Sequence, residues 1–113
     1  MNPAQAQAGV ATFSEVIRLK PGFAEGWNKR ATLYYYLGRY AESIADCDEV
    51  IRLNPHHFGA LAGFGQNYAR LDDLEKSLVY FERALAINPN MQGVALNIIG
   101  LRKLIVEKAR RAI

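Results

Sequence analysis

The sequence of 113 residues contains only one cysteine and four prolines, and it has no long apolar run. A single thiol, Cys47, cannot form an internal disulfide or complete a structural zinc site, so the fold must depend on its core. The apolar runs are far shorter than the ~20 residues that span a bilayer, and no basic start precedes an apolar segment. We expect a cytoplasmic protein without a membrane span; an export signal that has already been removed is the alternative.

Charge is nearly balanced except at one end of the chain. Half of the residues are hydrophobic and 22% are charged, which is typical of one globular domain rather than a disordered chain. Residues 1–100 carry nine Lys or Arg and ten Asp or Glu. The formal net charge of +3 therefore comes from residues 101–113, where Glu107 is outnumbered by five cations: Arg102, Lys103, Lys108, Arg110 and Arg111.

The chain repeats itself with a period of 34 residues. Pro21, Pro55 and Pro89 are separated by this distance, and the six-residue stretches that end in them align without a gap. Within one unit, Trp27 and Tyr34 are seven residues apart on one helical stripe, which ends at a glycine; a second stripe then ends before the proline. Proline cannot continue a helix. Each period thus predicts an antiparallel helical hairpin, and no segment alternates like a strand.

This pattern resembles the tetratricopeptide repeat family. The first copy of its signature comprises Trp27, Ala31, Tyr34, Gly38, Tyr40 and Pro55, and the second Leu61, Gly65, Tyr68, Leu74, Ser77, Phe81, Ala84 and Pro89. Three positions depart from it: Arg30 stands for leucine, Cys47 for an aromatic residue and Asp72 for the turn glycine. The pentatricopeptide family, which reads RNA, fits worse because its period is 35.

The resemblance implies an all-α, right-handed α-solenoid of helical hairpins, with two full repeats and a half repeat at each end. We expect one domain over residues 1–113. Its parts are the second helix of an incomplete repeat (3–20), two repeats (24–57 and 58–91) and a C-terminal capping helix (92–113).

The first helix lacks its companion, so we expect an apolar stripe there to be partly uncovered. The stripe consists of Val10, Phe13, Val16 and Ile17. Two hypotheses would explain its cover: a second copy of the chain, giving a homo-oligomer, or a preceding helix of a longer repeat protein.

No catalytic constellation is evident, so we expect no enzyme, cofactor or metal. Cys47 lies on an apolar stripe and is interpreted as a buried thiol. His56 and His57 are adjacent in a turn and lack ligands at metal-binding spacing. The glycine-rich stretch 59–65 lacks the strand and the Gly-Lys-Ser/Thr of a phosphate loop. The acidic group Asp46, Asp48 and Glu49 is expected to form a solvated helix face.

In the family, first helices line a concave groove that receives a peptide segment or a partner helix. A helical wheel therefore predicts groove residues on the three first helices: Asn28, Thr32, Tyr35, Tyr36, Gln66, Arg70 and Lys103. Tyrosine and arginine are frequent binding anchors, although the tyrosines could instead cover neighbouring helices. We expect a protein-interaction module or scaffold, whose partner the sequence does not identify.

Two other interpretations are weighed against this one. Some family members bind the C-terminal carboxylate of chaperones through lysines and asparagines, but Asn28, Thr32 and Gly63 stand where Lys, Asn and Asn would be expected. The five cations of residues 101–113 could bind nucleic acid or another acidic surface. No aromatic residue is interleaved with them, and cations are favourable at any helix C-terminus, so nucleic acid is the weaker alternative.

Overall fold

The computed structural model describes residues 1–112, which form six helices and no strand. The fold class is the expected one. The helices are α1 (Pro3–Leu19), α2 (Ala24–Tyr36), α3 (Tyr40–Leu53), α4 (Phe58–Arg70), α5 (Leu74–Ile87) and α6 (Gln92–Arg111). None of these helices is long and apolar enough to cross a membrane.

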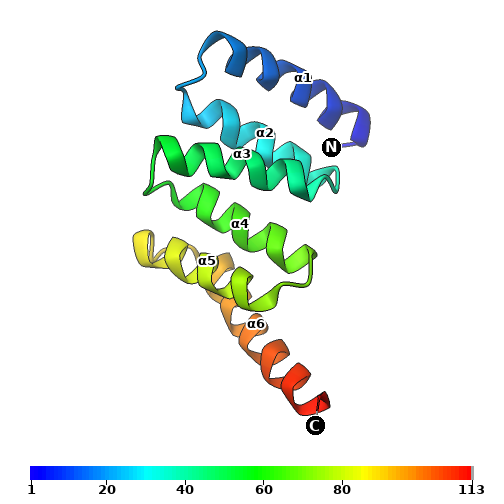
Figure 1. The fold of residues 1–113 in the computed structure, drawn as a ribbon, viewed down its shortest axis with the longest axis vertical. Helices are drawn as coiled ribbons and strands as arrows, with labels where there is room; N and C mark the ends of the chain where they lie inside the picture. Colours follow the sequence, from blue (N-terminus) through cyan, green and yellow to red (C-terminus); the bar gives the residue numbers. More distant parts are fainter. Residues whose placement is uncertain (113) are drawn as a thin grey trace.

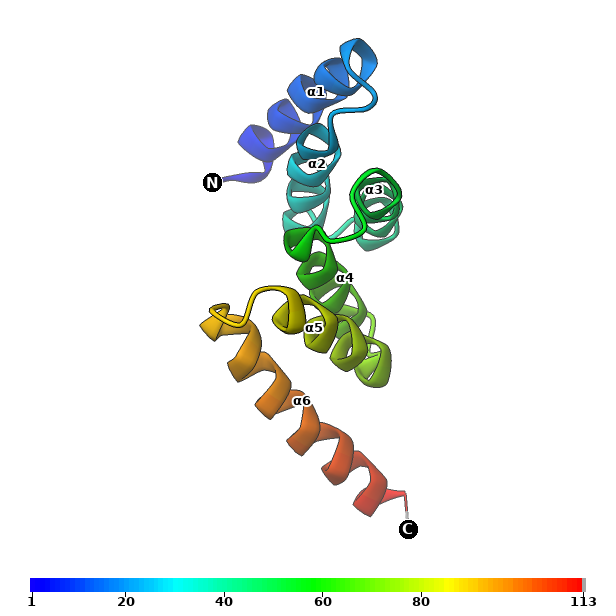
Figure 2. The same cartoon turned by 90° about the vertical axis from the view of Figure 1, so that its left-hand side faces the viewer.

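The helices follow one another as a ladder from α1 to α6 (Figure 1). Each helix packs on the next along the chain, and α2 also contacts α4. The result is elongated, with extents of 52 × 29 × 21 Å. Seen from the side, α3 stands beside the line formed by α2 and α4 (Figure 2). The first helices of the two repeats are therefore neighbours, and residues on their shared side can form one continuous surface.

Local signals in the sequence set the helix ends. The side chain of Asn2 caps α1 by accepting from the backbone N–H of Gln5, whose side chain in turn accepts from the backbone N–H of Asn2. Pro3 occupies the first turn, where its missing N–H costs nothing. The turns between paired helices need a left-handed residue, and Gly38 and Asp72 fill the same place in the two repeats, with φ of 75° and 63°. Asp72 thus adopts a conformation that favours glycine.

Replacing Asp72 with glycine is expected to raise the free energy of unfolding by about 0.5 to 1 kcal/mol, because the left-handed strain disappears. Asp72→Ala is the matched control. Both substitutions remove the exposed ion pair between Asp72 and Lys108 (2.7 Å), but alanine keeps the strain. Urea denaturation should therefore rank the stabilities as glycine, then aspartate, then alanine; equal stability of the two variants would contradict the backbone explanation.

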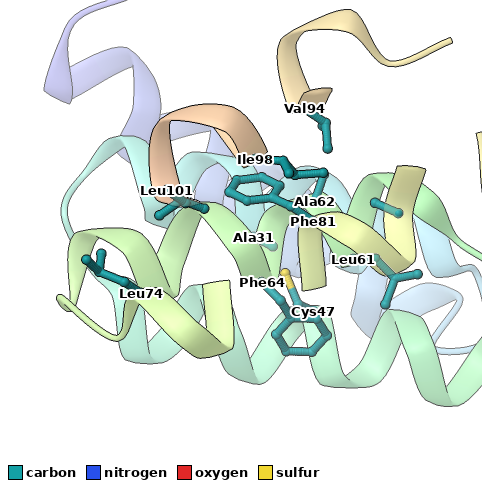
Figure 3. Packing of buried hydrophobic residues seen from close by; sticks show 11 residues of the cluster. Ala31, Cys47, Leu61, Ala62, Phe64, Leu74, Phe81, Val94, Ile98 and Leu101 are labelled. Atoms are coloured by element: carbon teal, nitrogen blue, oxygen red, sulfur yellow. The ribbon is translucent and has the colours of Figure 1, made fainter. Parts of the chain in front are cut away.

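The main core runs through five helices, from Ala31 of α2 to Leu101 of α6. Figure 3 shows Phe81 of α5 beside Ile98, with Leu101 nearby, so the capping helix α6 is joined to the second repeat by buried side chains. Cys47 is 1% exposed. Burial raises the pKa of its thiol to about 12, so it is an uncharged packing group at neutral pH, as its place on the apolar stripe predicts.

One acidic residue that we expected in solvent is buried. Asp46 is 3% exposed, and its two carboxylate oxygens accept from Nε and Nη2 of Arg30, each at 2.8 Å. Arg30 also donates to Ser14 Oγ at 3.1 Å and lies over the ring of Trp27. The hydrogen bonding of Arg30 to Asp46 raises the pKa of Arg30, although burial of the guanidinium acts to lower it. The prediction of a solvated face was wrong for Asp46, because the residue that replaces the usual leucine in α2 carries its counter-charge.

The apolar stripe of α1 is also less open than predicted. Val10 and Ile17 are 5% and 8% exposed, so the expectation of a partly uncovered stripe was wrong for these two residues; Phe13 and Val16 are half-buried, which agrees with it. The cause is that α1 packs on the helix that follows it. Val10 clusters with Ala6 and Leu33, a residue of α2. Phe13 and Val16 are the part of the stripe that stays partly open, and its cover by a second copy stays a prediction.

Candidate functional site

Three hollows lie in a row along α2 and α4 and continue to α6. The central hollow, of about 40 Å³, shares Asn28 and Gly59 with a hollow of about 360 Å³ at one end. It shares Tyr35 and Gln66 with a hollow of about 340 Å³ at the other end. Because neighbouring hollows have walls in common, they form one continuous depression, which we call the groove.

One end of the groove, the Arg70 hollow, combines hydrogen-bond donors with apolar side chains. Arg70 Nε donates to the hydroxyl oxygen of Tyr35 at 2.9 Å, and its guanidinium lies 5.8 Å from the centre of that ring. The opposite wall belongs to α6 and contains Leu96, Gly100 and Leu104. Leu96 and Leu104 are 68% and 49% exposed, so this hollow presents apolar surface beside a cation.

The other end, the Glu25 hollow, carries a carboxylate and two imidazoles. His57 Nδ1 accepts from the backbone N–H of Ala60 at 3.0 Å and so caps α4. Its Nε2 is in contact with the carboxylate of Glu25. Since Nδ1 is the acceptor, the ring proton is on Nε2, which donates a hydrogen bond to the carboxylate of Glu25. This hydrogen bond holds the pKa of Glu25 below its usual value.

The two ends of the groove therefore carry opposite charges. Among the described residues that line the three hollows, Arg70 is the one arginine or lysine and Glu25 the one carboxylate. They lie at opposite ends, with neutral side chains between them. A ligand in the groove meets an acceptor at one end and a cationic donor at the other.

Most residues chosen by the helical wheel do line the groove. These are Asn28, Thr32, Tyr35, Gln66 and Arg70. Their role in binding stays a prediction. The prediction missed His57 and Asn67: His57 was considered only as a metal ligand, and Asn67 is wholly buried. Glu25 lies on the same arc of the helical wheel as Asn28 and Thr32, but it was not among the predicted binding residues.

Two selected residues lie elsewhere. Tyr36 lines none of the three hollows, because it ends α2 and its hydroxyl donates to the carbonyl oxygen of Met1. Lys103 lines a separate hollow on α6 with Arg102 and Arg110. Leu96, Gly100 and Leu104 recur every four residues and form the groove wall, so Lys103 is turned about 100° away from Leu104.

The cations of the C-terminal helix are largely engaged by carboxylates. Lys108 pairs with Asp72 at 2.7 Å, Arg102 lies 3.6 Å from Glu82 and Arg111 lies 3.8 Å from Glu107. These exposed pairs contribute little stability, but they lower the net positive charge of this surface. The geometry therefore gives no specific support to nucleic-acid binding.

Comparison with known proteins places the two hairpins in one family. Residues 24–57 and 59–91 each match the tetratricopeptide repeat, and together they make up more than half of the chain. The chain belongs to the tetratricopeptide repeat family. A TPR repeat-containing protein of Rhizobium etli is 39% identical over 82 residues, which are 73% of this chain and 40% of that protein. The Hsp70-Hsp90 organizing protein of Triticum aestivum is 24% identical over 100 residues, or 88% of this chain and 17% of that protein. The chain thus spans less than half the length of these two relatives.

Solved TPR domains have the same fold. The first TPR domain of human RPAP3 superposes with a TM-score of 0.89 at 20% identity, covering 95% of this chain and 84% of that one. The first TPR of Spaghetti (RPAP3), solved with the HSP90 peptide SRMEEVD, gives 0.87 at 19% identity, covering 91% and 82%. At this identity the likeness establishes the architecture only.

Proposed function

We propose that this TPR domain is a non-catalytic protein-interaction module that binds an extended polypeptide segment along the groove. The observation that carries the proposal is the continuity of the three hollows, which share side chains of α2 and α4. The narrow centre, of about 40 Å³, suits an extended chain better than a helix about 10 Å wide. Structural neighbours that bind peptides support this class of function.

The ends of the groove indicate the chemistry of the segment. Arg70 suits an acidic or polar group through a charge-assisted hydrogen bond, and the leucines beside it suit an apolar side chain. Glu25 at the other end favours a basic or donor group. Asn28 and Thr32, which line the centre, are neutral, so we infer a ligand other than the C-terminal carboxylate of chaperones.

The double variant Arg70→Ala, Gln66→Ala tests this proposal. Peptides are first selected from a random-sequence phage library on the immobilised chain, and their affinities are then measured by fluorescence anisotropy. We expect the double variant to bind the selected peptides at least ~10-fold more weakly, because about 1.4 kcal/mol is lost with one charge-assisted hydrogen bond.

Arg52→Ala is the matched control. Arg52 is an exposed arginine of α3 that pairs with Glu49 at 2.8 Å and lines none of the three hollows. It should leave both affinity and helix content unchanged. Selection of no peptide at all, or equal binding by the double variant with unchanged circular dichroism, would refute the groove as the binding site.

A further inference from the structure

The centre of the groove holds a buried acceptor that no group in the chain satisfies. Asn67 is 0% exposed, and its Nδ2 donates to Ser43 Oγ and to the carbonyl oxygen of Gly63, both at 2.9 Å. Ser43 Oγ in turn donates to the carbonyl oxygen of Ala31 at 2.7 Å, which fixes the direction of the chain of hydrogen bonds. Within residues 1–112, Asn67 Oδ1 is the buried side-chain nitrogen or oxygen that lacks a partner.

The residue that carries this acceptor, Asn67, lines the central hollow. Asn67 lines it together with Ala31, Gly59 and Gly63, whose small side chains leave the space open. Leaving a buried acceptor unpaired costs about as much free energy as a hydrogen bond contributes, so a donor brought by a ligand is favoured here. Donors with a side-chain amide or hydroxyl already on the rim are Asn28, Thr32 and Gln66.

The size and charge of the hollow restrict what can enter. A water molecule needs about 10 to 15 Å³ of such space, so a hollow of about 40 Å³ takes a group of roughly three non-hydrogen atoms. No carboxylate lines it among the described residues, so an ammonium group would be buried without a counter-charge. A carboxamide has three such atoms, is neutral, and offers both a donor and an acceptor.

We propose that the central hollow receives the carboxamide of an asparagine or glutamine in the bound segment, which donates an N–H to Asn67 Oδ1. The inference rests on the proposed function of the groove and names its central specificity element. Asn28 and Gln66, which also line the hollow, carry amide donors for the acceptor oxygen of the same carboxamide.

The first repeat shows that packing alone does not require an asparagine here. Leu33 occupies the equivalent position 34 residues earlier, is 9% exposed and packs beside Gly9, the equivalent of Ser43. That leucine fits because a glycine faces it: a Cβ at Gly9 would lie 2.7 Å from Leu33 Cδ1, so a leucine at position 67 also has to accommodate the side chain of Ser43. Asn67→Leu removes the acceptor while keeping a side chain of similar size.

A pair of small probes tests the subsite without a peptide. We titrate the isotope-labelled chain with acetamide and with acetone, which has the same shape but no N–H donor, and follow the backbone amides of Gly59 and Gly63 and the Asn67 side-chain amide by NMR. Acetamide is expected to shift these signals saturably and to bind about tenfold more tightly than acetone, the factor that one hydrogen bond provides. Equal effects of the two probes, or no saturable shift with acetamide, would overturn the subsite.

Two variants assign the effect to the hollow. Asn67→Leu should abolish the difference between acetamide and acetone. Thr32→Leu, at an exposed position on the rim, should block both probes without touching the core, and it decides the matter where Asn67→Leu fails to fold. Lys29→Leu, on an exposed position of α2 outside the three hollows, is the control and should change nothing.

The phage-selected peptides separate this inference from the proposed function. Asparagine or glutamine should be enriched at one position of the peptides selected on the natural chain, and the enrichment should disappear on Asn67→Leu. Peptides that bind the groove without any carboxamide preference would overturn the subsite and leave the groove intact. Failure to select peptides, with acetamide still bound at the Asn67 subsite, would instead count against the proposed function.

Discussion

Replacing Arg30 with methionine is expected to lower the free energy of unfolding by about 3 to 5 kcal/mol, the usual effect of leaving a buried charge without its partner. The side chain of Asp46 is only 5% exposed and that of Arg30 18%. Methionine keeps much of the aliphatic volume, so the loss reports the charge rather than a cavity. Urea denaturation followed by circular dichroism measures it.

A second substitution separates the ion pair from the packing around it. Asp46→Leu in the Arg30→Met background should restore most of the lost stability, because an apolar pair of similar volume can replace a buried ion pair at little cost. Arg18→Met is the control, since Arg18 and Glu15 form an exposed pair at 2.5 Å and should matter by less than about 1 kcal/mol. A double variant less stable than Arg30→Met would show that Asp46 has another stabilising role.

The architecture was predictable because the same sequence pattern occurs three times in the chain. A 34-residue period places equivalent residues in equivalent surroundings, and the same hydrogen bond recurs: Ser43 Oγ donates to Ala31 and Ser77 Oγ to Gly65, at 2.7 and 2.6 Å. The ion pair of Arg30 and Asp46 was not predicted, because it occurs in one repeat only. The sequence nevertheless contained an indication of this ion pair: Arg30 occupies a position where the family usually has leucine, and Asp46 lies on the next helix.

The site was predictable where helices are regular and repeated. A helical wheel built on α2 and α4 placed Asn28, Thr32, Gln66 and Arg70 correctly on the groove. It failed at Lys103, because this residue is turned about 100° around α6 from the row of Leu96, Gly100 and Leu104 that forms the groove wall. The unpaired oxygen of Asn67 was beyond prediction, since it depends on which hydrogen bonds its amide already makes.

Gly65→Val is the second substitution with a large expected effect. A Cβ at Gly65 would lie 2.7 Å from a ring carbon of Phe81, closer than real Cβ atoms approach their neighbours. Phe81 is 2% exposed and belongs to the core, so overpacking is expected to lower the free energy of unfolding by about 3 kcal/mol. In the first repeat, Ala31 stands at the position of Gly65 and Cys47 at the position of Phe81. The residue on the first helix is thus larger than in the second repeat, and the residue on the second helix is smaller.

Because the side-chain volumes at these two positions compensate each other between the repeats, we expect the effects of substituting Gly65 and Phe81 on stability to be strongly non-additive. In a Phe81→Ala background, which by itself should cost about 3 to 5 kcal/mol, Gly65→Val should no longer destabilise, because its side chain enters the space that the ring has left. Gly100→Val provides the matched control in mid-helix: nothing lies within 4 Å of its Cβ position, so stability should stay equal or rise slightly. Additive effects of Gly65→Val and Phe81→Ala in urea denaturation would refute the steric explanation. The small residue of each repeat would then be required by the helix backbones themselves and not by the aromatic side chain opposite.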